Sequence, residues 1–339
     1  MSVDLSPWRD EAVAAVVRAL YARHPELTER FGERGARACR EDIAHHLDYL
    51  EGALAVNDAA LFSAYAVWLF SVLDSRGVPT RHLAESFELL EGFFTKHLPA
   101  LDAARVAGML AAAKIAMDAP PFPCMSERVP ALPDAERYRE AALGGDQRSA
   151  LKLVSGAMQE GITLTEASVR LIQPAMYQIG RLWQENRVSV AQEHLATAVS
   201  QSILARAYME ADFAPVVGRK AMFAAVAGNQ HSLGLRMLSD AFETQGWDAF
   251  YLGADVPTSA LIRQVDATRP DLLALSLSLP GHLLVARESL ERLRSELGSR
   301  CPAIWIGGLS TLSSDRVWRS LKADGWAADA LHALERGVS

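Results

Sequence analysis

Apolar residues recur at helical spacing, with few breakers, over the first third of the chain, from about Trp8 to Met117. Two clear stripes are formed by Leu61, Tyr65, Trp68 and Leu69, and by Phe87, Leu90, Phe93 and Phe94. The turn 76–79, with sequence RGVP, separates two of these helices. The pattern predicts an all-helical N-terminal domain over residues 1–118.

Prolines dominate the next segment, residues 119–133. Each proline removes a backbone donor and biases the residue before it towards extended geometry. We therefore expect a linker here.

Helical periodicity returns over residues 134–215, with breaks at the glycine pair 144–145, at Gly161 and at 186–187. Two capping boxes, Thr163-x-x-Glu166 and Ser189-x-x-Gln192, predict helices that begin just after Thr163 and Ser189. Four helices of this length predict a small four-helix bundle.

The period changes again after Gly218, where short runs rich in strand formers alternate with helical patterns. The predicted strands are 221–227, 249–252, 272–277 and 303–306, and the predicted helices between them are 233–245, 259–267 and 284–297. This rhythm is typical of a parallel, doubly wound sheet. We thus expect a multidomain chain that ends in an α/β Rossmann-like (flavodoxin-like) domain over residues 216–339.

Composition and charge narrow the classes of partner. Hydrophobic residues make up 50% of the chain, and 34 Lys plus Arg against 41 Asp plus Glu give a net charge of -7. We see no basic run that could neutralise a row of phosphates, no apolar stretch long enough for a membrane helix and no secretory signal. We expect a cytoplasmic protein that binds no nucleic acid directly, and reduced thiols at Cys39, Cys124 and Cys301.

Candidate ligand-binding residues lie where the predicted parallel strands end. His231 follows the first strand, Ser276 and Ser278 close the third, and Gly307-Gly308 follow the fourth. The carboxyl ends of parallel strands share one edge of the sheet, and ligands bind at that edge. A lone histidine in such a loop more often makes only a hydrogen bond than binds a metal. The assignment of His231 as a metal ligand therefore depends on the residues in the other loops at this edge.

These residues resemble the cobalamin-binding domain of methionine synthases, corrinoid methyltransferases and cobalamin photoreceptors, whose pattern is D-x-H-x-x-G, then S-x-L, then G-G. The resemblance implies base-off binding, with His231 as the lower cobalt ligand and the displaced nucleotide tail passing Ser276 and the two glycines. Imidazole is a good ligand for cobalt, a serine hydroxyl can hydrogen-bond the tail, and glycine lets the backbone approach it.

The match has two departures: Asn229 stands where the family has aspartate, and Ser278 where it has leucine, while Gly234 keeps its place. Asn229 can still accept a hydrogen bond from the His231 ring but adds no negative charge, so we expect a weaker electron push onto cobalt. A receiver domain is the alternative for this segment, but it needs clustered acidic residues after its first strand, where this chain has Asn229 and Gln230.

The helical block carries a second motif. Trp183 is followed after nine residues by Glu193-His194, which resembles the W-x9-E-H motif of the CarH and LitR class of light sensors. The resemblance implies that a four-helix bundle caps the upper face of adenosylcobalamin, with Trp183 against the adenosyl group. Gln184 stands where that class has a histidine that captures cobalt after photolysis, which argues against a bis-histidine light state.

The N-terminal domain lacks the basic recognition helix with which CarH-type proteins begin. An α-domain before the cap and cobalamin domains resembles photocobilins, which carry biliverdin beside cobalamin. Such a pigment needs an apolar cleft, for which the stripe of Tyr65, Trp68, Phe93 and Phe94 is a candidate, and cations such as Arg76 and Arg81 for its propionates. A plain helical core is the alternative explanation of the stripe.

Taken together, the motifs predict a non-enzymatic, cobalamin-dependent photoreceptor. We expect it to signal through a protein partner, and a homo-oligomer is compatible with this prediction. Two alternatives stay open: a corrinoid carrier of a methyltransferase system, which shares the cap and cobalamin domains, and a helical scaffold with a vestigial cobalamin fold.

Overall fold

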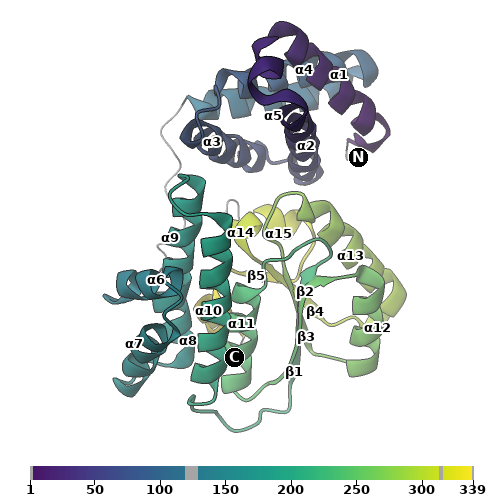
Figure 1. Ribbon diagram of the computed structural model, residues 1–339. Coiled ribbons are helices and arrows are strands. Elements are labelled where there is room, and N and C mark those ends of the chain that lie inside the picture. Colours follow the sequence, from purple (N-terminus) through teal and green to yellow (C-terminus); the bar gives the residue numbers. More distant parts are fainter. Residues whose placement is uncertain (1–2, 119–128, 313–315, 338–339) are drawn as a thin grey trace. The chain divides into compact units, whose positions relative to one another are not determined.

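The computed structural model describes residues 3–118, 129–312 and 316–337, and the chain forms two compact units (Figure 1). One unit comprises Met1–Pro123 with Leu279–Leu284, and the other comprises Cys124–Ser278 with Val285–Ser339. Most of the predicted proline-rich linker, residues 119–128 with Cys124, lies outside the described residues. None of the described helices is both long enough and apolar enough to span a bilayer.

The first unit is helical, as the apolar periodicity predicts. Its helices are α1 (Arg9–Arg23), α2 (Glu26–Val56), α3 (Ala59–Ser75), α4 (Arg81–His97) and α5 (Ala100–Met117), after a short 3-10 turn, Ser6–Trp8. Asp58 caps α3 by accepting a hydrogen bond from the Ala60 amide at 3.0 Å. Gly32 has φ +57°, a conformation that glycine adopts at no steric cost, and it kinks α2.

The aromatic stripe forms the core of this helical unit. Tyr65, Phe93 and Phe94 are buried, and Trp68 is half-buried. The Tyr65 ring stacks on Tyr49 with their centroids 3.7 Å apart, and the Tyr65 hydroxyl is hydrogen-bonded to Nδ1 of the buried His46 at 2.8 Å. The expectation that this stripe lines an open pigment cleft is therefore wrong, because most of it is packed against other side chains.

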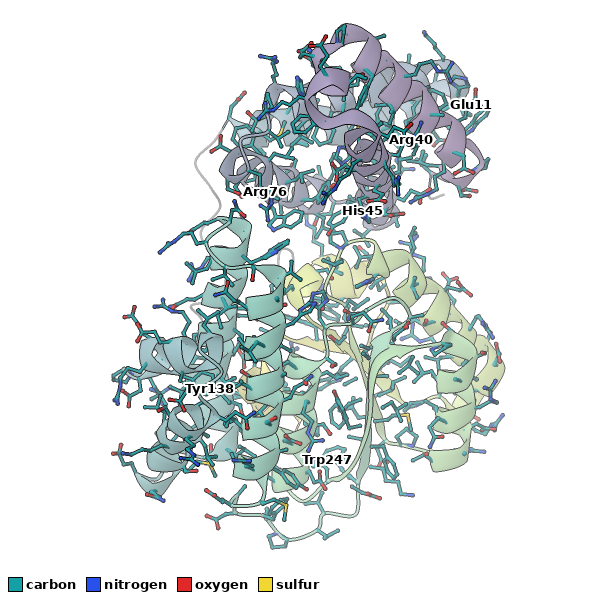
Figure 2. All side chains as sticks on the ribbon, viewed as in Figure 1. Glu11, Arg40, His45, Arg76, Tyr138 and Trp247 are labelled. Atoms are coloured by element: carbon teal, nitrogen blue, oxygen red, sulfur yellow. The ribbon has the colours of Figure 1, made fainter. Side chains whose placement is uncertain are left out.

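Four helical segments form the cap at the start of the second unit. They are α6 (Ala135–Leu143), α7 (Gln147–Gln159), α8 with α9 (Leu164–Ala167 and Gln173–Gln184), and α10 (Val190–Tyr208). Both capping boxes are present: Thr163 and Ser189 each accept from the amide three residues on, and Glu166 and Gln192 accept in return. Tyr138 lies inside this bundle, where its hydroxyl donates to Ser200 Oγ at 3.1 Å (Figure 2).

A π-helical turn, Ser168–Ile172, joins α8 to α9. Pro174 has no amide hydrogen, so it cannot make the helical bond to the carbonyl four residues earlier. The wider turn accommodates this missing donor just before α9 starts. The sequence predicts the start of this helix at Thr163 but not the irregular turn within it.

The rest of the second unit is a five-stranded parallel sheet, and its strand order is β2-β1-β3-β4-β5. The strands are β1 (Lys220–Val226), β2 (Asp248–Val256), β3 (Leu272–Ser276), β4 (Ala303–Gly307) and β5 (Gly325–Ala327). The helices are α11 (Leu233–Thr244), α12 (Thr258–Thr268), α13 (His282–Leu297), α14 (Leu309–Leu312), α15 (Arg316–Ser320) and α16 (Ala330–Gly337). Figure 1 shows α11 on one face of the sheet and α12 and α13 on the other. This confirms the predicted doubly wound α/β fold.

The cap packs on α11 of the sheet domain. Met237 of α11 belongs to the buried core of the cap, and Leu233 packs against it. The guanidinium of Arg236 lies over the rings of Tyr208 and Tyr251, 5.7 and 5.4 Å from their centroids, and pairs with the buried Asp240. Burial raises the pKa of Asp240 to about 6 against the opposing effect of Arg236. Cap and sheet thus share an apolar and charged interface.

Candidate functional site

The strand register places the predicted residues beside one another at the carboxyl edge of the sheet. Ala225 of β1 pairs with Ser276 of β3, and Ser276 pairs with Gly307 of β4. The chain order reverses between β1 and β3, and doubly wound sheets bind ligands outside the strands at such a switch point. The loop after β1, with Asn229 and His231, lies at this point.

Asn229 is fully buried and links the two strands at the switch point. Its Nδ2 donates to the Ser276 carbonyl at 2.9 Å, and its Oδ1 accepts from the His231 amide at 3.1 Å. A carbonyl can only accept and an amide can only donate, so these two contacts fix which way the side chain points. An aspartate would set an oxygen against the Ser276 carbonyl, which explains why asparagine suits this position.

The orientation of Asn229 also fixes the tautomer of His231. Asn229 Oδ1 lies 3.2 Å from His231 Nδ1 and accepts its hydrogen, which leaves a lone pair on Nε2. Although His231 is exposed, the protein around its ring lowers its pKa by desolvation, and the negative charge of Glu193 acts in the opposite direction. His231 is therefore a neutral imidazole near pH 7 with Nε2 available as a ligand.

Asp255 holds the same loop from the other side, and the sequence analysis missed it. Its Oδ1 accepts from the Gly228 amide at 2.7 Å and its Oδ2 from Gln230 Nε2 at 3.3 Å, while its own amide donates to the Asn229 carbonyl at 3.0 Å. The available signal was its position at the end of a strand next to the one that carries His231.

The glycines in the predicted set differ in their surroundings. A Cβ on Gly308 would lie 2.4 Å from the Leu277 carbonyl oxygen, and one on Gly307 would lie 2.9 Å from the Ala327 carbonyl oxygen. Close approach of the chain to itself therefore already requires these two glycines. A Cβ on Gly234 would meet no atom within 4 Å, so the first turn of α11 faces open space. Ser278 is buried just after β3.

The predicted cap residues lie at the end of α9 and the start of α10. Trp183 is half-buried in the last turn of α9. Glu193 accepts from Thr197 Oγ1 at 2.9 Å and pairs with His194 Nδ1 at 2.6 Å, while the His194 side chain is 74% exposed. The structure thus brings Glu193 near enough to His231 for its charge to act on the ring.

The donor set limits what this site can bind. One imidazole does not hold a bare metal ion, because protein sites for such ions use three or four ligands. One imidazole is sufficient as an axial ligand of a metal that a macrocycle already holds. The chemistry of the donor set and the open space at Gly234 fit a metal-containing macrocycle with a tail.

Two family models match the second unit, and each is described as a B12 binding domain. One covers residues 134–208, which contain the cap, and the other covers residues 219–335, which contain the sheet and its helices. These matches support cobalamin binding by this part of the chain.

Two curated relatives come from Myxococcus xanthus. The chain is 30% identical over 195 residues to the HTH-type transcriptional repressor CarH and 32% identical over 153 residues to the HTH-type transcriptional repressor CarA. The matched parts are 56% and 42% of this chain, and they span 64% and 49% of the two repressors. The similarity therefore spans less than two thirds of the length of either repressor.

Among solved structures, the chain resembles the monomethylamine corrinoid protein of Methanosarcina barkeri. The TM-score is 0.50 at 17% identity, over 59% of this chain and 94% of that protein. At this level of identity the likeness concerns the fold alone. It agrees with the helical cap and parallel sheet described above.

Proposed function

We propose that the chain is a cobalamin-dependent photoreceptor that binds adenosylcobalamin in the base-off form, with His231 as the lower cobalt ligand. The observation that carries the proposal is the neutral His231 ring, whose tautomer is set by Asn229 and whose Nε2 carries the free lone pair. A ligand that needs no proton removed binds cobalt readily near neutral pH.

The edge of the sheet offers the surroundings that a nucleotide tail needs. Asn229 keeps the His231 ring in place, and the strand ends at Ser276 and Gly307 lie next to it. We assign Ser276, Ser278, Gly307, Gly308 and Gly234 to the path of the tail. The open space at Gly234 supports this assignment, whereas the two adjacent glycines are already required by the fold.

The start of α10 offers the opposite, upper side of the site. Glu193 and His194 supply polar groups, and Val190 and Leu195 beside them are apolar side chains that are 52% and 44% exposed. We assign Trp183, Glu193 and His194 to the adenosyl side. Adenosylcobalamin, when bound, supplies a cobalt to carbon bond that green or blue light breaks. The role of these residues is to hold the adenosyl group and to transmit its loss to the cap.

The output of this sensor is a protein contact. The two M. xanthus relatives are named as HTH-type repressors, but the described first unit of this chain is a helical domain with a densely packed aromatic core. We infer that the sensor signals through a partner protein or through self-association.

Biliverdin as a second chromophore belongs to the same proposal. The buried stripe does not provide its cleft, so a bilin must use another surface of the first unit. Titration of the full chain with biliverdin tests this, because binding is expected to produce a red-absorbing band. If no such band forms, the first unit is an interaction module.

Illumination separates the photoreceptor from a corrinoid carrier, the alternative function. The purified chain with adenosylcobalamin is kept dark or illuminated with green light, and its absorption spectrum and elution volume are measured. A sensor is expected to change both on illumination. A carrier is expected to lose the adenosyl group with no change in elution volume, and to exchange methyl groups with a methyltransferase in the dark.

A further inference from the structure

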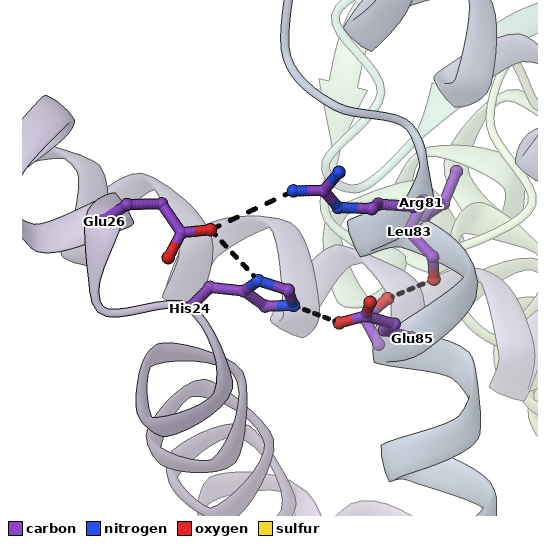
Figure 3. A network of polar contacts seen from close by, with 6 residues as sticks. His24, Glu26, Arg81, Leu83 and Glu85 are labelled. Atoms are coloured by element: carbon purple, nitrogen blue, oxygen red, sulfur yellow. Dashed lines mark hydrogen bonds and ion pairs between the residues drawn. The ribbon is translucent and has the colours of Figure 1, made fainter.

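A cluster of two histidines and a glutamate, His24, Glu26 and His82, lies in the first unit, outside the site described above. Figure 3 shows His24 and Glu26 of this cluster with Arg81 and Glu85 beside them. His24 and Glu26 lie at the junction of α1 and α2, and His82 lies in the first turn of α4. One nitrogen or oxygen atom from each of the three lies within 4.8 Å of the other two. Two imidazoles and a carboxylate form a ligand set that suits zinc and related transition metals.

His82 is the observation that points to a ligand. It is 8% exposed, and its Nε2 is buried with no hydrogen-bond partner. Buried polar atoms are nearly always paired, and leaving one unpaired costs about 1–3 kcal/mol.

His24 and Glu26 are joined by a hydrogen bond, so a metal ion bound by both would replace the proton between them. His24 Nδ1 lies 3.2 Å from Glu26 Oε1. Metal to ligand bonds of 2.0–2.1 Å at a tetrahedral ion place neighbouring ligand atoms about 3.3 Å apart. The other ring nitrogen, His24 Nε2, donates to Glu85 Oε2. Metal-binding histidines typically donate their second N–H to a carboxylate in this way.

We propose that His24, Glu26 and His82 bind a divalent transition-metal ion of the Zn²⁺ type. His24 binds through Nδ1, and Glu85 is the positioning residue that holds its ring. The cluster lies on a cavity of about 430 Å³ that Glu26 and His82 help to line, which gives the ion access and leaves room for a fourth, non-protein ligand.

Arg81 is the competing cation at this site. Its Nη2 lies 3.9 Å from Glu26 Oε1, but its side chain is 64% exposed and can turn to solvent. Coordination of Glu26 by an ion would replace this weak pair. Arg81→Gln is therefore expected to leave metal affinity unchanged or to raise it.

The test is a calorimetric titration of the full chain with ZnCl₂, with zinc content measured after gel filtration. The variants His82→Ala, Glu26→Gln and Glu85→Gln probe the cluster. His45→Gln is the matched control, because it removes an exposed imidazole of the same unit that lies outside the cluster. His231→Ala excludes binding at the edge of the sheet.

The proposal expects about one Zn²⁺ per chain in the wild type and in both controls. Affinity is expected to fall at least tenfold in His82→Ala and Glu26→Gln, and about 10–100-fold in Glu85→Gln. If His82→Ala does not fold, Glu26→Gln decides, since Glu26 is exposed. Absence of saturable binding in the wild type, or unchanged affinity in Glu26→Gln, would overturn the proposal.

Discussion

The helical core of the first unit and the edge of the sheet use the same side chain in opposite ways. His46 is 2% exposed and hydrogen-bonded to Tyr65, and its burial lowers its pKa to about 3. His231 is exposed and hydrogen-bonded to Asn229, and Nε2 remains available. Both rings are neutral at pH 7, yet one completes a core and the other presents a lone pair. The two histidines differ in whether the protein buries Nε2, the ring nitrogen that makes neither of these hydrogen bonds. Of these two, the histidine with a buried Nε2 is structural, and the one with an accessible Nε2 is a candidate ligand.

Removing a core aromatic residue is expected to have the largest effect and to act on one unit only. Phe94 is fully buried, and Phe94→Ala is expected to lower the free energy of unfolding of the first unit by about 3–5 kcal/mol. Denaturant unfolding by circular dichroism measures this. Leu101→Ala, at a residue that is 76% exposed, is the control and is expected to cost under about 0.5 kcal/mol. Cobalamin affinity that falls together with core stability would contradict the separate roles of the two regions.

The buried His46 is expected to lower the free energy of unfolding as the pH falls. Its pKa is about 3 when folded and 6.5 in its ordinary state, so only the unfolded chain takes up its proton between these values. Stability is complete above about pH 6.5 and falls by about 1.4 kcal/mol per pH unit below it. From pH 7 to pH 5 the loss is about 2 kcal/mol.

The variant His46→Gln isolates this effect from other groups. Glutamine does not titrate and can still hydrogen-bond the Tyr65 hydroxyl. Denaturant unfolding at pH 5, 6 and 7 is expected to show a shallower pH dependence in the variant. Equal slopes in the wild type and the variant would show that His46 is not buried as described.

Asn229→Asp tests the counterpart at the edge of the sheet. The carboxylate would face the Ser276 carbonyl, and at pH 8 we expect a loss of about 2 kcal/mol. At pH 5 the loss is expected to shrink, because a protonated carboxyl group can donate to that carbonyl. Unfolding of the variant and the wild type at both pH values measures the difference. A variant as stable as the wild type at pH 8 would refute the assigned orientation of Asn229.

The smallest expected effect concerns the adenosyl side. Trp183→Ala is expected to reduce the preference for adenosylcobalamin over methylcobalamin by about tenfold, or about 1.4 kcal/mol, because the larger upper ligand loses its packing surface. Equilibrium binding of both cobalamins in the dark measures the preference. Phe213→Ala, an exposed aromatic of the same unit, serves as the control. An unchanged preference would remove the case for a sensor over a methyl carrier.

Local signals made most of the fold predictable. The capping boxes at Thr163 and Ser189 start helices where expected, and the alternation of short strands and helices correctly predicts the parallel sheet. The sequence did not predict β5, because three residues, Gly325–Ala327, carry no readable periodicity. The sequence also did not predict the π-helical turn before Pro174, because this turn alters the hydrogen-bond spacing only locally within an otherwise regular helix.

Contacts between distant segments account for what was missed at the sites. The bond from Asn229 to Ser276 depends on β1 lying beside β3, which a single sequence does not reveal. Asp255 and the cluster at His24 and His82 likewise join segments far apart in the chain. The aromatic stripe shows the converse, because its spacing was read correctly but periodicity does not distinguish a packed core from a cleft.

The central claim is that His231 binds cobalt from below, and the absorption spectrum of cobalamin bound in the dark tests it most directly. Wild type and His231→Ala are each mixed with adenosylcobalamin and compared with His194→Ala, which removes the exposed imidazole of the cap. We expect a base-off, histidine-bound spectrum in the wild type and in His194→Ala. In His231→Ala we expect loss of that spectrum and at least tenfold weaker binding. An identical spectrum and affinity in His231→Ala would show that His231 is not the lower cobalt ligand.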